Sequence, residues 1–130
     1  MAVAGMNHFT ILTDDLDETL AFYDEHLGLK PGARPPFAFP GAWLYPGGSG
    51  DAILHVIAGI ERKALVKGVI DHMAFTGRDL AATVQKLKEK SISYELRKLP
   101  SYGTWQLFFH DPNGAKVEID FDPAEAAPAA

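Results

Sequence analysis

The sequence predicts an α+β fold in which one unit, a strand followed by a helix and about three more strands, occurs twice along the chain. Three observations support this prediction. The residues that flank His8 resemble those that flank His72, and in both places a leucine lies eight residues after the histidine. In both copies an alternating stretch precedes a stretch whose apolar residues have helical spacing. Each copy then closes with strand-like stretches joined by a turn rich in Gly, Pro, Asn or Asp.

The elements of the first half follow from local patterns. Residues 8–12 alternate between apolar and polar side chains, which predicts a strand. Leucines and a tyrosine at helical spacing predict a helix over residues 15–26, and Gly28 is placed to end it as a C-cap. Residues 43–45 and 52–57, separated by a Gly-rich turn, predict two further strands.

The second half repeats this order. Residues 72–76 predict a strand and residues 79–90 a helix. An Asp-Pro-Asn-Gly sequence then marks a turn between two strands at residues 106–109 and 116–120.

At 130 residues the chain has the length of one domain, which most often holds about 100–150 residues. We therefore expect a single domain over residues 1–121. It divides into module one at about 6–58, a linker at 59–68 and module two at about 69–121. Residues 122–130 are rich in Ala and Pro, which predicts a flexible tail.

Composition excludes several classes of function. The chain has no cysteine, which excludes disulfides, thiolate nucleophiles and cysteine-based metal sites. A metal would therefore need histidine, carboxylate or water ligands, which suit Fe(II), Mn(II), Ni(II), Co(II) or Zn(II). The net charge is −5 and no basic run exceeds two adjacent residues, so no nucleic-acid partner is expected.

The longest apolar stretch, residues 52–60, is short and interrupted, so no membrane span is expected. Residues 1–6 lack the pattern of a signal peptide. We therefore expect a cytoplasmic protein whose partner is a small molecule.

Strand alternation places four residues of metal-ligand type on one face of the predicted sheet: His8, His55, His72 and Glu118. Their neighbours on the opposite face are apolar and are the natural partners of each module's helix. A lone strand histidine is more often a core or surface residue than a ligand, but equivalent positions in a repeat favour a metal site. By contrast, His26 in the last turn of the first predicted helix is explained by the helix dipole.

A second group of residues can form the wall of a substrate pocket, because these aromatic side chains lie in Pro- and Gly-rich stretches of both halves: Phe37, Phe39, Trp43, Tyr45, Tyr102 and Trp105. Core packing explains Trp43 and Trp105 equally well. Arg34 and Arg97 are able to pair with a substrate carboxylate. An aromatic or medium-sized oxygenated substrate fits this wall better than a phosphorylated one.

The chain resembles the vicinal oxygen chelate superfamily, the glyoxalase/bleomycin resistance/dioxygenase group, over roughly residues 6 to 121. The motifs that carry the resemblance are Asn7-His8-Phe9, Asp14-Asp15-Leu16, Ala21-Phe22-Tyr23 through Gly28-Leu29, and the stretch from Asp111 to Glu118. The resemblance implies two tandem βαβββ modules that form an open, curled eight-stranded sheet around a metal-binding cavity. It also implies one divalent metal ion per site, chelated by two substrate oxygens, and a homodimer whose sites draw on both subunits.

Within that group, His8, His72 and Glu118 match the two-histidine, one-carboxylate set of extradiol dioxygenases and fosfomycin resistance enzymes. Glyoxalase-type isomerases have a second carboxylate where this chain has His55, so His55 is expected to be a fourth ligand or a general base. The resemblance thus implies a metal-dependent lyase, isomerase or ring-cleaving dioxygenase, with Glu118 and His55 as catalytic residues. The alternative is a non-catalytic resistance protein that binds a drug or antibiotic.

Overall fold

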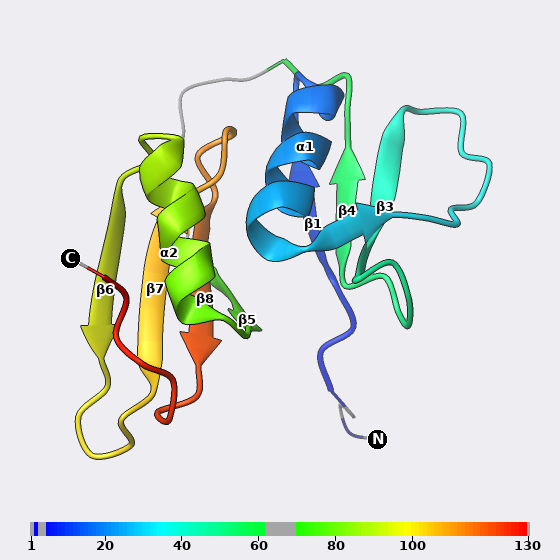
Figure 1. Cartoon of the computed structure of the whole chain (residues 1–130). Coiled ribbons are helices and arrows are strands. Elements are labelled where there is room, and N and C mark those ends of the chain that lie inside the picture. The colour runs from blue at the N-terminus through cyan, green and yellow to red at the C-terminus, as the bar shows by residue number, and fades with distance from the viewer. Residues whose placement is uncertain (1, 3–4, 62–69, 130) are drawn as a thin grey trace.

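A computed structural model describes residues 2, 5–61 and 70–129, so most of the predicted linker at 59–68 lies outside the described residues. Figure 1 shows the two modules side by side. Module one consists of β1 (Phe9–Leu12), α1 (Leu16–Leu27), β2 (Leu29–Pro31), β3 (Gly41–Pro46) and β4 (Leu54–Ile57). Module two consists of β5 (Met73–Thr76), α2 (Leu80–Glu89), β6 (Tyr94–Lys98), β7 (Trp105–His110) and β8 (Lys116–Phe121).

The eight strands form two four-stranded sheets, with the orders β1-β4-β3-β2 and β5-β8-β7-β6. In each sheet the first strand of the module pairs in parallel with the last, and the other pairs are antiparallel. The prediction of an α+β fold with two tandem βαβββ modules is confirmed. Within the described part of the chain the two sheets do not join, so the eight strands do not form one closed or continuous sheet.

The two helices begin in different ways. Asp15 caps α1 by accepting a hydrogen bond from the Glu18 backbone N–H at 3.0 Å, and Gly28 ends the helix with a left-handed φ of 66°. Asp79 at the start of α2 also has a left-handed φ, of 64°, and its side chain caps nothing. Instead, the Leu80 N–H at the start of α2 donates to the Glu125 carboxylate at 2.7 Å.

The residues predicted as a flexible tail therefore contact module two. Besides capping α2 through its side chain, Glu125 accepts a hydrogen bond from the Trp105 indole at its carbonyl oxygen, at 3.0 Å. Lys88 on α2 donates to the Ala129 carbonyl at 2.8 Å. The C-terminal segment in Figure 1 lies along this module.

Each helix covers the apolar face of its own sheet and leaves the other face open for a site. In β4, Leu54 and Val56 are buried, and in β8 Val117, Ile119 and Phe121 are buried. These residues belong to one core cluster with the inward-facing residues of the helices. Burying such side chains stabilises the fold by roughly 1.5–3 kcal/mol each.

The modules meet where α1 contacts α2 and the turn between β7 and β8. The buried Tyr23 hydroxyl donates to the Asp111 carboxylate at 2.7 Å, and burial raises the pKa of this tyrosine far above its usual value. Asn113 donates to the Thr19 hydroxyl at 3.0 Å. No helix among the described residues has the length and apolar character needed to cross a membrane.

Candidate metal and substrate site

The first half of the candidate metal site lies on the open face of the module one sheet. His55 is on β4, opposite Thr10 of β1, and His8 immediately precedes β1. The two imidazole rings stack with their centroids 3.7 Å apart and their planes 16° apart. Strand alternation thus predicted the correct face for both histidines.

The second half lies on the open face of the module two sheet. The His72 Nε2 atom lies 3.4 Å from the Glu118 Oε2 atom. Glu118 is buried, and its Oε1 atom accepts a hydrogen bond from Gln106 at 3.1 Å. Two ligand atoms of one tetrahedral metal ion, each about 2.1 Å from it, lie about 3.4 Å apart, so this pair has the spacing of two metal ligands.

The residue before each of the two equivalent histidines sets its tautomer. The Nδ1 atom of His8 lies 2.7 Å from the Asn7 side-chain oxygen, and that of His72 lies 2.8 Å from the Asp71 carboxylate. Because both partners are acceptors, they favour the neutral tautomer with the ring proton on Nδ1 and the lone pair on Nε2. Histidines that bind metal through Nε2 have this arrangement, in which the other ring nitrogen donates to a carboxylate or carbonyl oxygen.

The structure brings the four predicted ligands together as two pairs and not as one cluster. Nowhere in the described residues do three or more histidine or carboxylate side chains lie close enough to hold one metal ion. A single chain therefore presents His8 with His55 in one place and His72 with Glu118 in another.

Burial and the neighbouring His8 ring lower the pKa of His55, and a hydrogen bond that the ring donates to the Ala52 backbone carbonyl offsets part of this effect. The imidazole is consequently neutral near pH 7. A neutral imidazole is able to act as a ligand or to accept a proton.

Most of the predicted pocket residues of module one surround His55. The Trp43 ring stacks on His55 at 4.1 Å with planes 8° apart, and Phe37 lies 6.4 Å from Trp43. Phe37 stacks on Phe39 at 4.9 Å, and the Arg34 guanidinium lies over both rings. These residues line a cavity of about 150 Å³ beside His55.

Three of the predicted pocket residues lie outside this cavity. Tyr45 is on β3, two residues beyond Trp43, and its hydroxyl donates to the Ala33 carbonyl. Tyr102 is in the turn before β7 and is 78% exposed. Trp105 pairs with Phe121 on the helix-covered side of its sheet. The structure therefore does not bring Tyr102 or Trp105 to the open face.

The open face of module two instead contains Phe108, which the sequence interpretation missed. Phe108 lies directly opposite Glu118 in the strand register and makes an edge-on contact with His72 at 5.8 Å. Arg97 lies over this ring at 4.6 Å. Residues that pair across two antiparallel strands point to the same face of the sheet. Pairing the strand that contains Glu118 with the preceding strand would therefore have selected Phe108 rather than Trp105 for the open face.

Asp120 is a further carboxylate on the open face of module two, two residues beyond Glu118. Its Oδ1 atom is buried and has no hydrogen-bond partner among the residues that the structure describes. Burial raises the pKa of Asp120, and the nearby His72 opposes this shift. A metal ion or a substrate hydroxyl at the His72–Glu118 pair would lie on the same face as this oxygen.

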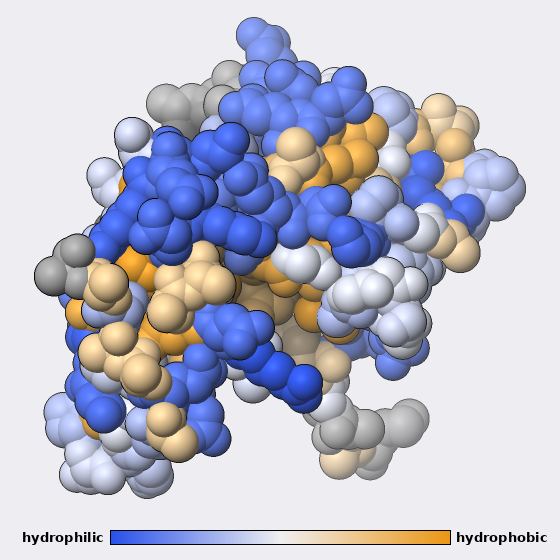
Figure 2. All heavy atoms as spheres, viewed as in Figure 1, coloured by the Kyte–Doolittle hydropathy of each residue, from blue (hydrophilic) through white to orange (hydrophobic). Residues whose placement is uncertain are grey.

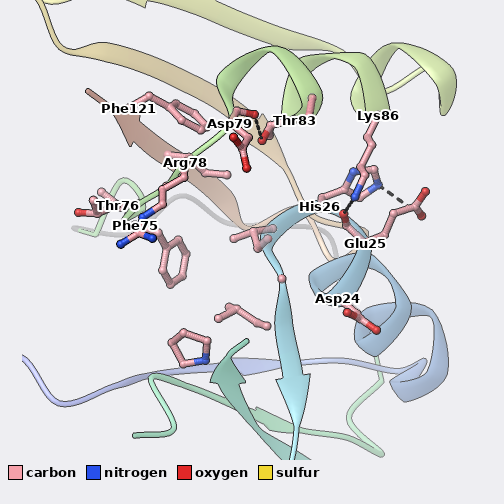
Figure 3. Close-up of a pocket in the computed structure, with 18 of the residues that line it drawn as sticks. Asp24, Glu25, His26, Phe75, Thr76, Arg78, Asp79, Thr83, Lys86 and Phe121 are labelled. Atoms are coloured by element: carbon pink, nitrogen blue, oxygen red, sulfur yellow. Dashed lines mark hydrogen bonds and ion pairs between the residues drawn. The ribbon is translucent and has the colours of Figure 1, made fainter. Parts of the chain in front are cut away.

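A larger cavity of about 620 Å³ lies between the modules and contains none of the four candidate ligands. Figure 2 shows apolar side chains in the hollow between the two modules. Figure 3 shows His26, Glu25 and Lys86 on one side of this cavity and Phe75, Thr76 and Arg78 on the other. The four candidate ligands are thus separate from this inter-module cavity.

Comparison with known proteins gives matches along almost the whole chain. The profile of the Glyoxalase/Bleomycin resistance protein/Dioxygenase superfamily matches residues 5–119. Glyoxylase I 4 from Arabidopsis thaliana is 34% identical over 126 residues, which cover 90% of this chain and 70% of that protein.

Solved structures share the fold at lower identity. A fosfomycin resistance protein, FosX, from Listeria monocytogenes, solved with Mn(II) and 1S,2S-dihydroxypropylphosphonic acid, has a TM-score of 0.72 at 15% identity, covering 93% of this chain and 94% of that one. Lactoylglutathione lyase from Agrobacterium tumefaciens has a TM-score of 0.65 at 19% identity, covering 98% of this chain and all (100%) of that one. Fold, profile and relative agree: the chain belongs to the glyoxalase/bleomycin resistance protein/dioxygenase superfamily.

Proposed function

We propose that this protein is a divalent-metal-dependent enzyme of the glyoxalase type that acts on a small, oxygen-chelating and partly aromatic or apolar substrate. The observation that carries the proposal is the matched pair of half-sites, each with a histidine whose Nδ1 atom is held by the preceding side chain. This arrangement frees the Nε2 atoms of His8 and His72 for a metal. His55 and Glu118 complete the donor set, and one imidazole or carboxylate beside each histidine suits a divalent first-row metal.

The two half-sites require a second copy of the chain in this proposal. His8 and His55 of one subunit would face His72 and Glu118 of the other, so a homodimer would contain two complete sites. The proposal is supported by the separation of the two pairs within one chain. It is also supported by the open faces on which both pairs lie.

When bound, the metal supplies a Lewis acid that stabilises negative charge on a substrate oxygen. The residues of the chain then have separate tasks. Gln106 orients the Glu118 carboxylate, and the aromatic rings around His55 exclude water from the substrate. Glu118 and His55 are the groups placed to hold or move a proton, since Glu118 is a buried carboxylate and His55 is a neutral base.

Among the reactions open to this superfamily, we favour lyase or isomerase chemistry of the glyoxalase I kind. The relative with 34% identity is named a glyoxylase I, and it matches 90% of this chain. Such chemistry requires a proton to be taken from carbon and returned to a neighbouring atom, which a neutral base beside a metal performs. Ring cleavage by a dioxygenase would instead require Fe(II) and consumption of O₂.

The test is titration of chelator-stripped protein with Mn(II), Ni(II), Zn(II) and Fe(II), followed by calorimetry. We expect one ion per chain, with affinity lowered at least tenfold in Glu118→Ala and His72→Ala. Glu89→Ala is a matched control, because Glu89 is an exposed glutamate of α2 remote from the donors. His55→Ala separates the two roles of His55. If His55 is a metal ligand, the substitution lowers metal affinity, and if it is only a general base, the substitution lowers turnover and leaves metal affinity unchanged.

A protein that binds none of these ions contradicts the proposal. Turnover of hemithioacetals without O₂ supports the glyoxalase reading, and O₂ consumption with catechols refutes it. Retention of small-molecule affinity without metal or turnover would favour a non-catalytic binding protein.

A further inference from the structure

We propose that the cavity beside His55 binds a single aromatic ring of the substrate, and that Arg34 binds a carboxylate at the end of the substrate remote from its chelating oxygens. The inference deepens the proposed function and rests on it, because the cavity shares His55 with the candidate metal site. It names the substrate class as a monocyclic aromatic carboxylate.

The size of the cavity sets the size of the ring. Its volume is about 150 Å³, and a cavity of about 150 Å³ accommodates one benzene molecule. Phe37 and Trp43 form its aromatic wall, while Val56 and Ile57 add aliphatic surface. A planar ring packs against such walls in offset or edge-on contacts.

Arg34 is prepared to receive an anion. Its guanidinium lies 5.0 Å from the centre of the Phe37 ring and 5.1 Å from that of Phe39. One of its nitrogens donates to the Phe39 carbonyl at 2.9 Å, which fixes the orientation of the group. A Cβ atom at residue 41 would lie 2.2 Å from the Val56 carbonyl oxygen and 3.1 Å from a guanidinium nitrogen of Arg34, so only a glycine fits where the chain passes this close to both.

No carboxylate among the described residues pairs with Arg34. Arg97, its counterpart over Phe108 in module two, lies 3.9 Å from the Glu95 carboxylate. A guanidinium has five N–H donors, and Arg34 uses one of them in its hydrogen bond to the Phe39 carbonyl. The remaining donors match the two oxygens of a carboxylate.

The order in which the rings contact one another indicates how the ligand lies in the cavity. The rings lead from His8 to His55, then to Trp43 and Phe37, and Arg34 lies over the last of them. A substrate whose chelating oxygens lie at the histidines therefore extends its ring toward Phe37. Its carboxylate then reaches Arg34 at the far side of the cavity.

The experiment measures benzoate binding to wild-type protein by calorimetry, with EDTA present so that no metal contributes. Arg34→Met removes the charge and keeps an apolar side chain, and Arg78→Met is the control, since Arg78 is exposed and borders only the inter-module cavity. In a Trp105→Phe background Trp43 is the sole tryptophan, and its fluorescence reports whether benzoate lies beside it. Acetate has the carboxylate without the ring, and benzyl alcohol has the ring without the charge, so the two compounds test these features separately.

We expect benzoate to bind more tightly than acetate or benzyl alcohol and to change the emission of Trp43. Arg34→Met should weaken benzoate about tenfold or more and leave benzyl alcohol within twofold, because charge-assisted hydrogen bonds are lost. Equal benzoate affinity in Arg34→Met and wild type, or affinity no better than for acetate, overturns the inference. Since metal is absent, this result is independent of the metal titration: benzoate binding without metal binding refutes the proposed function alone.

Discussion

If His72 is a metal ligand, its hydrogen bond to Asp71 predicts that substitutions at Asp71 weaken metal binding. Asp71→Ala removes the acceptor that lies 2.8 Å from the His72 Nδ1 atom, and with it the constraint on the tautomer and orientation of the ring. Loss of such a partner typically weakens metal binding by about 10–100-fold. We expect Asp71→Ala to fall in this range.

Asp71→Asn distinguishes geometry from charge. The equivalent residue in module one is Asn7, which holds the His8 Nδ1 atom at 2.7 Å with a neutral amide oxygen. Asp71→Asn therefore keeps an acceptor of the same shape, and we expect a loss of roughly threefold to tenfold, smaller than for alanine. The asparagine also lacks the negative charge that Lys116 contacts at 3.4 Å.

Affinities are measured by competition with a fluorescent chelator, and Asp17→Ala on the exposed first turn of α1 is the matched control. The control should retain wild-type affinity. Wild-type affinity in Asp71→Ala would refute the reasoning, because His72 would then need no partner to bind metal.

Three further predictions concern stability. Tyr23→Phe leaves the buried Asp111 carboxylate without its hydroxyl donor and should lower the free energy of unfolding by about 1–3 kcal/mol in urea titrations. Burial lowers the pKa of His26 in the folded state below that of the unfolded chain, so stability is lost as the pH falls below about 6.5. His26→Leu should reduce this pH dependence between about pH 6.5 and pH 5. Glu125→Ala removes the acceptor for the Leu80 N–H and should cost about 1 kcal/mol, whereas Glu125→Gln should cost less.

Each of these has a result that contradicts it. An unchanged unfolding free energy for Tyr23→Phe would mean that the inter-module hydrogen bond is replaced by water. An unchanged pH dependence in His26→Leu would assign the acid sensitivity to other groups. Equal losses for the two Glu125 variants would show that the C-terminal segment stabilises α2 by packing and not by capping.

Much of the site was predictable because a strand has a period of two residues. Once His55 and Glu118 were recognised as equivalent, their apolar neighbours fixed which face each occupied, and the structure has both on the open faces. The end of α1 followed from Gly28, which caps the helix as predicted, whereas Asp15, predicted as the first helical residue, is the N-cap.

The failures have equally specific causes. Both faces of β7 carry aromatic residues, so composition did not distinguish Trp105 from Phe108, and only pairing with β8 does. Asp79 has the residue type of an N-cap but adopts a left-handed backbone, and Glu125 caps α2 from 45 residues away. Contacts between distant segments of this kind leave no local pattern in the sequence.

The residue pattern alone did not predict the division of the site into two pairs, which was expected only from the resemblance to the superfamily. The repeat shows which residues are equivalent, but it contains no information on which module faces which. The distances within each pair follow from strand register, whereas the distance between pairs depends on how whole modules pack.

The central claim, a metal site completed by two chains, is tested most directly by mixing two inactive variants. One variant carries His8→Ala and His55→Ala, and the other carries His72→Ala and Glu118→Ala. After the two are unfolded and refolded together, about half of the dimers are mixed, and each mixed dimer contains one intact site out of two. If two chains complete each site, the mixture binds about one quarter of the wild-type amount of metal per chain, while each variant alone binds none. A mixture that binds no more metal than its two parents would contradict this claim.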